Sequence, residues 1–191
     1  MMQRRQQPGF TLIELMVTLA ILVILVLLAV PSFRGLIEKS RLRGAADDVV
    51  NLIGVGRAEA IKRQRNVTIA PRGTASAWCV GANRAADPTV GQPAPAAAAC
   101  DCSTDATKCV LENRVSVATP QANSGITSNT VTGSITFNAQ TGALFPVTTA
   151  PDVVTLSSPS GYALQITVSP LGQVAACVPT SSSFLAGYPS C

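Results

Sequence analysis

The sequence FTLIELMVTLAILVILVLLAV, residues 10–30, decides the fold of this chain. The run carries a single charged side chain, that of Glu14, four places after Phe10. At about 1.5 Å of rise per residue it forms a helix about 30 Å long, the thickness of a bilayer core. We therefore expect a transmembrane helix over residues 10–30. A carboxylate inside such a helix costs free energy, so Glu14 calls for a cationic partner.

Two other interpretations of this run are weighed against that expectation. A cleaved secretory signal would end in a small-x-small site, and the nearest approach, Leu27-Leu28-Ala29, begins with a large residue. A plain single-pass anchor would gain nothing from a charge near its end. Basic residues flank the run on both sides, and those at 34–43 would keep the C-terminal side inside the cell. The cysteines favour the opposite orientation, as shown below.

The segment Gly9-Phe10-Thr11-Leu12-Ile13-Glu14-Leu15-Met16 resembles the processing site of type IV prepilins and type II secretion pseudopilins. The resemblance implies that residues 1–9 are a leader, which a prepilin peptidase removes by cutting after Gly9. Phe10 is then N-methylated, and residues 10–30 are retained as a filament-core helix. Glu14 would neutralise the Phe10 amine of a neighbouring subunit, because two opposite charges buried together cost less than either alone. The alternative is that Glu14 extends to the lipid head groups.

Helical periodicity continues beyond the apolar run. Pro31 fixes φ and lacks an N–H donor, so we expect a kink there, and we count Pro31 with Phe10 and Glu14 among the assembly residues. Apolar or small residues then recur at steps of three or four, which predicts an amphipathic helix over residues 31–66 with one face toward a core. These positions are Leu42, Ala46, Val49, Ile53, Gly56 and Ala60.

The pattern changes after residue 66. Tyr162, Leu164, Ile166 and Val168 alternate with smaller or polar residues, which predicts a half-buried strand, followed by a turn at 169–172 and a partner strand at 173–178. Residues 85–99 are rich in Pro and Ala and predict an exposed loop. The fold class is therefore α+β: a long N-terminal helix packed on a small antiparallel β-sheet head, residues 67–191. Shorter strands are predicted at 67–70, 77–80, 114–118, 134–138 and 153–157.

All six cysteines lie in the head: Cys79, Cys100, Cys102, Cys109, Cys177 and Cys191. An even number in an exported domain indicates disulfides, which places the head in the oxidising periplasm. We favour a bridge between Cys177 and Cys191, because the C-terminal segment would otherwise be untethered. The pairing of the other four stays open. A zinc site is the rival interpretation, but the spacing is unusual for zinc and the chain has no His. We predict no metal and no cofactor.

The layout also resembles one branch of this family, the minor pilins and pseudopilins of the FimT/GspH type. The resemblance rests on residues 56–63, on Trp78-Cys79, on Cys100-Asp101-Cys102 and on the ending Gly187-Tyr188-Pro189-Ser190-Cys191. Some members of that branch bind DNA through arginines in a C-terminal segment similar to residues 172–177. Here that segment has no Lys or Arg, so its affinity for phosphate should be poor.

An alternative DNA-contacting patch would combine Arg57, Lys62, Arg63 and Arg65 near the end of the amphipathic helix. The competing interpretation is that these cations are simply favoured by the helix dipole. The net charge is +4, and loss of Arg4 and Arg5 with the leader leaves 12 basic and 10 acidic residues. This near-neutral balance implies no general attraction to polyanions, so we rank DNA last among the partners.

The sequence argues against an enzyme. It has no His to act as the usual general base, and its cysteines are expected to be paired rather than nucleophilic. We predict a minor pilin of a type IV pilus, assembling through its N-terminal helix into the filament or its tip, with roles in pilus biogenesis, adhesion, twitching motility or DNA uptake. The alternatives are an H-type pseudopilin of a type II secretion system and a DNA-binding uptake pilin.

The predicted partners follow from this reading. They are other major and minor pilins or pseudopilins, the prepilin peptidase, the inner-membrane assembly platform and the inner membrane itself. We expect a single-pass protein of the bacterial inner membrane with its head in the periplasm, which enters the pilus filament after assembly.

Overall fold

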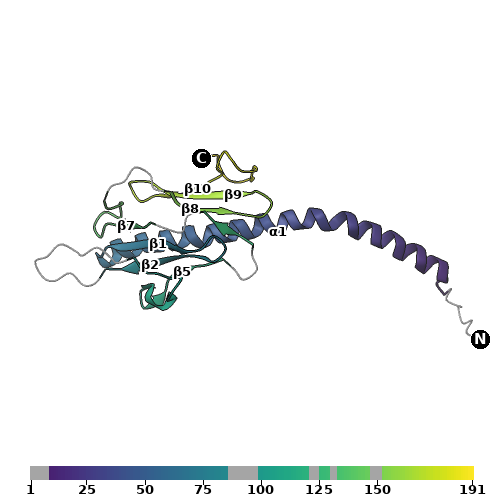
Figure 1. The fold of residues 1–191 in the computed structure, drawn as a ribbon, viewed down its shortest axis with the longest axis horizontal. Helices are drawn as coiled ribbons and strands as arrows, with labels where there is room; N and C mark the ends of the chain where they lie inside the picture. Colours follow the sequence, from purple (N-terminus) through teal and green to yellow (C-terminus); the bar gives the residue numbers. More distant parts are fainter. Residues whose placement is uncertain (1–8, 86–98, 121–124, 130–132, 147–151) are drawn as a thin grey trace, which may run out of the picture. The chain divides into compact units, whose positions relative to one another are not determined.

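The computed structural model describes residues 9–85, 99–120, 125–129, 133–146 and 152–191, without the side chains of residues 28–32, 152 and 153. Most of the predicted loop at 85–99 lies outside these ranges. The chain divides into two compact units, Met1–Ile37 and Glu38–Cys191. Helix α1, Leu12–Arg63, contributes its first part to the first unit and the rest to the second (Figure 1).

The predicted helix is confirmed, and it continues through Pro31. It ends three residues before the predicted boundary because Gln64 takes a positive φ of 52°. The Arg65 N–H then donates to the Ala60 carbonyl at 3.1 Å, which is the closing bond of a Schellman-type ending. A glycine usually occupies this left-handed position, and because Gln64 stands here the sequence contains no clear stop signal for the helix.

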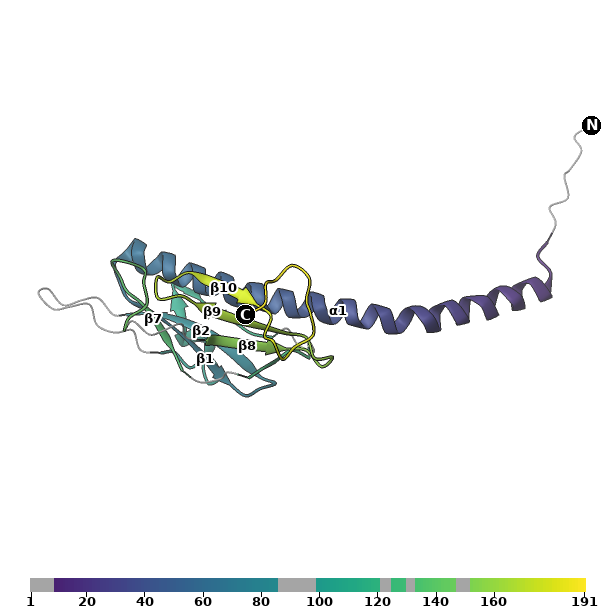
Figure 2. The ribbon, with the colours of Figure 1, turned by 90° about the horizontal axis from the view of Figure 1, so that it is seen from above.

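The globular unit contains two four-stranded antiparallel sheets, where the sequence predicted a single small one. The first has the order β5-β2-β1-β7, and β1 pairs with β2 along its whole length. The second has the order β10-β9-β8-β6. Figure 2 shows the ribbon of these sheets from a second direction. The first sheet consists of β1 (Val67–Gly73), β2 (Trp78–Arg84), β5 (Val117–Ala118) and β7 (Ile135–Phe137), and the second of β6 (Thr127–Ser128), β8 (Asp152–Ser157), β9 (Ala163–Val168) and β10 (Val174–Cys177).

One hydrophobic core joins both sheets to α1. The predicted helical stripe faces it: Leu42, Ala46, Val49, Ile53 and Ala60 are all fully buried. Gly56 is also buried, and a Cβ atom there would lie 2.9 Å from the Ile69 side chain, so glycine lets the helix approach β1. The buried stripe of the helix belongs to the same hydrophobic cluster as apolar residues of both sheets, among them Ile69 of β1 and Ile166 of β9.

The sequence predicted one continuous strand at 114–118, but the structure has two short strands, which are separated at Ser116. The Ser116 N–H donates to the Cys109 carbonyl at 2.8 Å, whereas its own carbonyl accepts from Ala82 N–H at 3.0 Å. The chain therefore changes partners at this residue. Before it, β3 (Val110–Leu111) and β4 (Arg114–Val115) form a short hairpin that the sequence analysis missed. Its two turn residues, Glu112 and Asn113, both have positive φ, as two-residue hairpins require.

All six cysteines are paired in disulfides. Cys177 bonds to Cys191, the pair favoured from the sequence, and this bridge ties the C-terminus to the end of β10. Cys79 bonds to Cys102, which anchors the segment 99–109 on β2, and Cys100 bonds to Cys109, which closes this segment on itself. A Cβ atom on Gly81 would lie only 2.6 Å from the Sγ atoms of Cys100 and Cys109, so glycine makes room for the second bridge.

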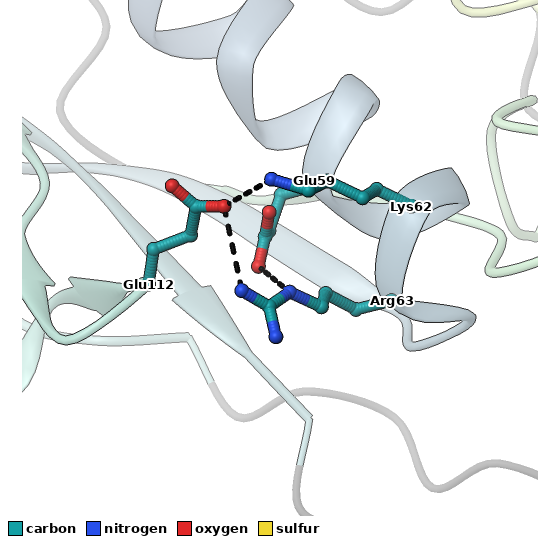
Figure 3. A network of polar contacts seen from close by, with 4 residues as sticks. All are labelled: Glu59, Lys62, Arg63 and Glu112. Carbon is teal, nitrogen blue, oxygen red and sulfur yellow. Dashed lines mark hydrogen bonds and ion pairs between the residues drawn. The ribbon is translucent and has the colours of Figure 1, made fainter.

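Charged side chains attach the β3–β4 hairpin to the end of α1 (Figure 3). Lys62 Nζ lies 2.6 Å from Glu112 Oε1, and Arg63 reaches the same oxygen at 3.5 Å. Arg63 Nε also lies 3.2 Å from Oε1 of the buried Glu59, an ionic contact without hydrogen-bond alignment. The hydrogen bond from Lys62, with its charge, lowers the pKa of Glu112 below the ordinary value of 4.5.

We expect the substitution Ile53→Ala to destabilise the globular unit by about 2–5 kcal/mol, because it leaves a cavity in the core. Val55→Ala, on the same helix but 56% exposed in the native protein, is the matched control and should change stability by less than about 0.5 kcal/mol. Unfolding can be followed by the fluorescence of the single Trp, Trp78, which is buried and donates its Nε1–H to the Ile126 carbonyl. Equal losses in the two variants would contradict this core assignment.

We expect Glu112→Gln to lower the thermal stability near neutral pH, because it removes the negative charge that pairs with Lys62 and Arg63. The folded pKa of Glu112 is lowered, so its stabilisation is complete above the ordinary carboxyl pKa and is lost as the pH falls through the folded value. The difference between wild type and variant should therefore shrink on acidification. Glu112→Gln should also have a smaller effect in a Lys62→Gln background. A pH-independent difference would argue against the ionic network.

Candidate functional site

The predicted processing site lies directly before α1. Gly9 and Phe10 are outside the helix, both are exposed, and the Phe10 side chain retains 87% of its accessible surface. No heavy atom lies within 4 Å of a Cβ built on Gly9. The backbone at this junction is therefore open to an enzyme, and a glycine here is not required by the packing of the chain itself. The residues that precede it, 1–8, lie outside the described part.

Glu14 occupies the first turn of α1, where its N–H donates to Oγ1 of Thr11 at 3.3 Å. Thr11 stands in the N-cap position, and a Glu three residues later has the spacing of a capping box. A carboxylate there is also favoured by the positive end of the helix dipole. Glu14 thus has a local role that the sequence analysis did not consider, although the Thr-x-x-Glu spacing was available as a signal.

The first part of α1 is apolar on every side. All residues from 9 to 27 are exposed, and each large apolar residue keeps at least half of its accessible surface. Within the described chain, no other element shields them. The hydroxyl of Thr18 finds its hydrogen-bond acceptor within the helix, since Oγ1 donates to the Leu15 carbonyl at 2.9 Å. Soluble helices expose a polar face, so a helix apolar all round requires a lipid or protein partner.

The sequence predicts that residues 10–30 form a helix and that this helix spans a membrane. Among the helices of the described residues, none is long and apolar enough to cross a membrane.

The candidate DNA-contacting residues have partners within the protein. Lys62 and Arg63 belong to the network of Figure 3, in which two cations face two carboxylates, Glu59 and Glu112. A phosphate would have to displace these carboxylates, so the cluster offers little free positive charge. Arg65 also interacts within the protein.

Arg57 joins the helix to two turns of the head. Its Nε donates to the Gly142 carbonyl at 3.0 Å and its Nη2 to the Leu171 carbonyl at 3.1 Å. Gly172, in the predicted turn and with a φ of 79°, lies so close that a Cβ atom would be 2.8 Å from Arg57 Nε. Arg57 therefore has a structural role within the head, whereas the sequence suggested it as part of an alternative DNA-contacting patch. In the described residues, no three potential metal ligands cluster.

Comparison with known proteins gives two family matches. Residues 45–172, more than half of the chain, match the family described as "Type II transport protein GspH". Residues 4–30 match the "Prokaryotic N-terminal methylation motif", which contains Gly9, Phe10 and Glu14.

Individual relatives are more distant. The type II secretion system core protein G of Aeromonas hydrophila is 49% identical over 51 residues, which cover 27% of this chain and 36% of that protein. The match thus spans little more than a third of that relative's length. Crystal structures of the type IV minor pilin FimU from Pseudomonas aeruginosa, in two space groups, align at 15% identity. Their TM-scores are 0.48 and 0.46, and the alignments cover 75% and 73% of this chain and 96% and 98% of FimU.

The match over residues 45–172 takes in the second half of α1 and most of the two sheets, and the methylation motif covers the exposed apolar segment before them. The chain belongs to the GspH family and carries the N-terminal methylation motif of the minor pilin and pseudopilin class.

Proposed function

We propose that this protein is a structural subunit of an extracytoplasmic filament, which it enters by packing the first part of α1 among the equivalent helices of other subunits. The observation that carries the proposal is the exposed apolar surface of residues 12–27, where each large apolar residue keeps at least half of its accessible area. At roughly 25 cal/mol per Å² of apolar surface, burial of such a helix is a strong driving force for association. The subunit has no enzymatic role; its partners are other pilins or pseudopilins.

The processing step follows from the exposed junction at Gly9 and Phe10. A prepilin peptidase cuts after Gly9 and methylates the new N-terminus at Phe10, so the leader is lost and the apolar helix is retained. This role is supported by the non-helical, solvent-exposed backbone at both residues and by the methylation motif that spans them.

Glu14 then has two competing roles. It can cap its own helix, or it can neutralise the Phe10 ammonium group of a neighbouring subunit. The ammonium group created at Phe10 lies near the positive end of the α1 dipole, which is unfavourable for a cation. A carboxylate from an adjacent subunit relieves this cost, and in an apolar filament core the pair is less costly than either charge alone. We propose that the pair of Glu14 and the neighbouring Phe10 ammonium group sets the axial register between subunits. Pro31, on the same helix, is a further residue that we assign to assembly.

Before assembly, the subunit resides in the inner membrane with a single pass and its head in the periplasm. An oxidising compartment is what three disulfides in the head require. The inner-membrane assembly platform then moves the processed subunit into the filament. A cytoplasmic head would keep its cysteines reduced and would lose these bridges, including the Cys79–Cys102 bond that holds residues 99–109 on β2.

The filament we favour is a type IV pilus, with this protein as a minor subunit at or near its tip, in line with the resemblance of residues 56–63 and of the ending 187–191 to minor pilins and pseudopilins of the FimT/GspH type. A type II secretion system is the second candidate, favoured by the family description and by the relative from Aeromonas hydrophila. A deletion strain separates them: loss of surface pili supports the first, and loss of protein secretion with intact pili supports the second.

We expect Gly9→Val to block leader removal. Since no other described residue lies within 4 Å of the new Cβ, the variant should fold normally, and the defect would report on the peptidase alone. Mass spectrometry of wild-type filaments should find an N-terminus at Phe10 that carries one added methyl group. Gly35→Val, also in open space on α1, is the matched control for a bulkier residue and should leave processing unchanged. A wild-type protein that keeps Met1 in the filament would contradict the proposal.

We expect Glu14→Gln to fold and to be processed like wild type but to enter sheared filaments at least about tenfold less efficiently, since a buried charge loses its partner. Gln at this position can still take part in a capping box, so the variant removes the charge while keeping the helix start. Thr11→Ala provides the reverse control: it removes the cap acceptor and keeps the carboxylate. A larger incorporation defect in Thr11→Ala than in Glu14→Gln would assign Glu14 to capping and overturn the pairing mechanism.

A further inference from the structure

A groove of about 500 Å³ lies on the globular unit between the exposed side of α1 and the first sheet. Its helical wall includes Leu52 and the exposed Val55, and its other wall is the chain that passes from β4 into β5. The groove is unrelated to the exposed N-terminal segment and to the ionic network at the end of α1. The lining residues are Asp48, Asn51, Leu52, Val55 and the run 115–119.

The second wall is an open sheet edge. Strand β5 stands last in the order β5-β2-β1-β7, so in the described part of the chain no strand pairs with its outer side. The Ser116 carbonyl points toward β2, where it accepts from Ala82 N–H. Because the two groups of a trans peptide point in opposite directions, the N–H of Val117 points away from β2. An extended peptide could use this edge as a pairing partner.

The groove also has a specific charge. Asp48 is its one charged lining residue, it is exposed, and it forms no ion pair with any residue that the structure describes. Its walls are otherwise apolar or neutral, with Val55, Val115 and Val117 on facing sides. A complementary occupant is therefore extended and apolar, with one Lys or Arg opposite the carboxylate. An acidic segment or a nucleic acid would be repelled by the same group.

We propose that this groove binds an extended segment of another pilin-class subunit, which adds to the edge of β5 and places a cation against Asp48. This inference rests on the proposed function, because it takes its partner from the same filament. The Val117 N–H needs a main-chain carbonyl as its acceptor. A whole helix, about 10 Å across, has most of its carbonyls bonded internally, whereas an extended strand presents free main-chain groups at every second residue. The contact would join heads at a site separate from the helical filament core.

The experiment uses the full chain in its own cells, with a photo-crosslinking benzoyl-phenylalanine at position 117. We expect a crosslinked peptide from a second subunit that carries an N-terminal methylation motif, and we expect that peptide to contain Lys or Arg. The matched control is the same group at position 175, which is exposed on β10, the edge strand of the other sheet. Equal yields of the same product from both positions would overturn the assignment, as would products with lipid or within the chain alone.

The charge is tested with Asp48→Asn, which should lower the crosslinking yield about threefold to fivefold, the scale of one solvent-accessible ion pair. Asp47→Asn is its control, because Asp47 is equally exposed but acts electrostatically on Tyr188 of the C-terminal segment. Both variants should still be processed and enter filaments. Absence of wild-type protein from filaments would overturn the proposed function and this inference together. Normal incorporation with no effect of Asp48→Asn would overturn the groove alone.

Discussion

Residues 12–27 present apolar side chains on every side of α1, and within the described chain nothing covers them. Water solvates such a surface poorly, so this part of the helix has to be enclosed by lipid or by other helices. The same helix changes character in its second half, where the stripe from Leu42 to Ala60 is buried and the remaining surface is mixed, with charged side chains beside the exposed Val55 and Ile61. One element therefore serves association at one end and the packing of a head at the other.

The head limits what else the molecule can do, because most of its charges are satisfied internally. The cations at the end of α1 hold the β3–β4 hairpin through Glu59 and Glu112, and Arg57 holds two turns through their carbonyls. These contacts explain why a cluster that looks basic in the sequence offers little to a polyanion. Asp48 stands out against this background, since it lines an open groove without a described ionic partner. Two kinds of contact are thus proposed along one helix: burial of an apolar surface with one charge pair at Glu14, and binding of an extended segment in the groove beside Asp48.

Much of the architecture could be predicted from local patterns. The helical stripe, the strand from Tyr162 onward and the turn at 169–172 all follow from periodicity and from turn residues, and the structure confirms them. The short strands β3 and β6 could not be predicted, because two residues are too few to show any period. The break at Ser116 was missed for a related reason: it depends on Cys109 and Ala82 reaching the same residue from different strands.

For the candidate site, the sequence by itself determined the proposed processing junction, the long apolar run and the isolated carboxylate of Glu14. These are properties of contiguous residues, whose composition and spacing act without the rest of the fold. Only the tertiary structure decided that Cys79 pairs with Cys102 and Cys100 with Cys109, that Lys62 meets Glu112, and that Asp48 faces the edge of β5. Each of these joins residues far apart in the chain, and their proximity depends on how the core brings helix and sheets together.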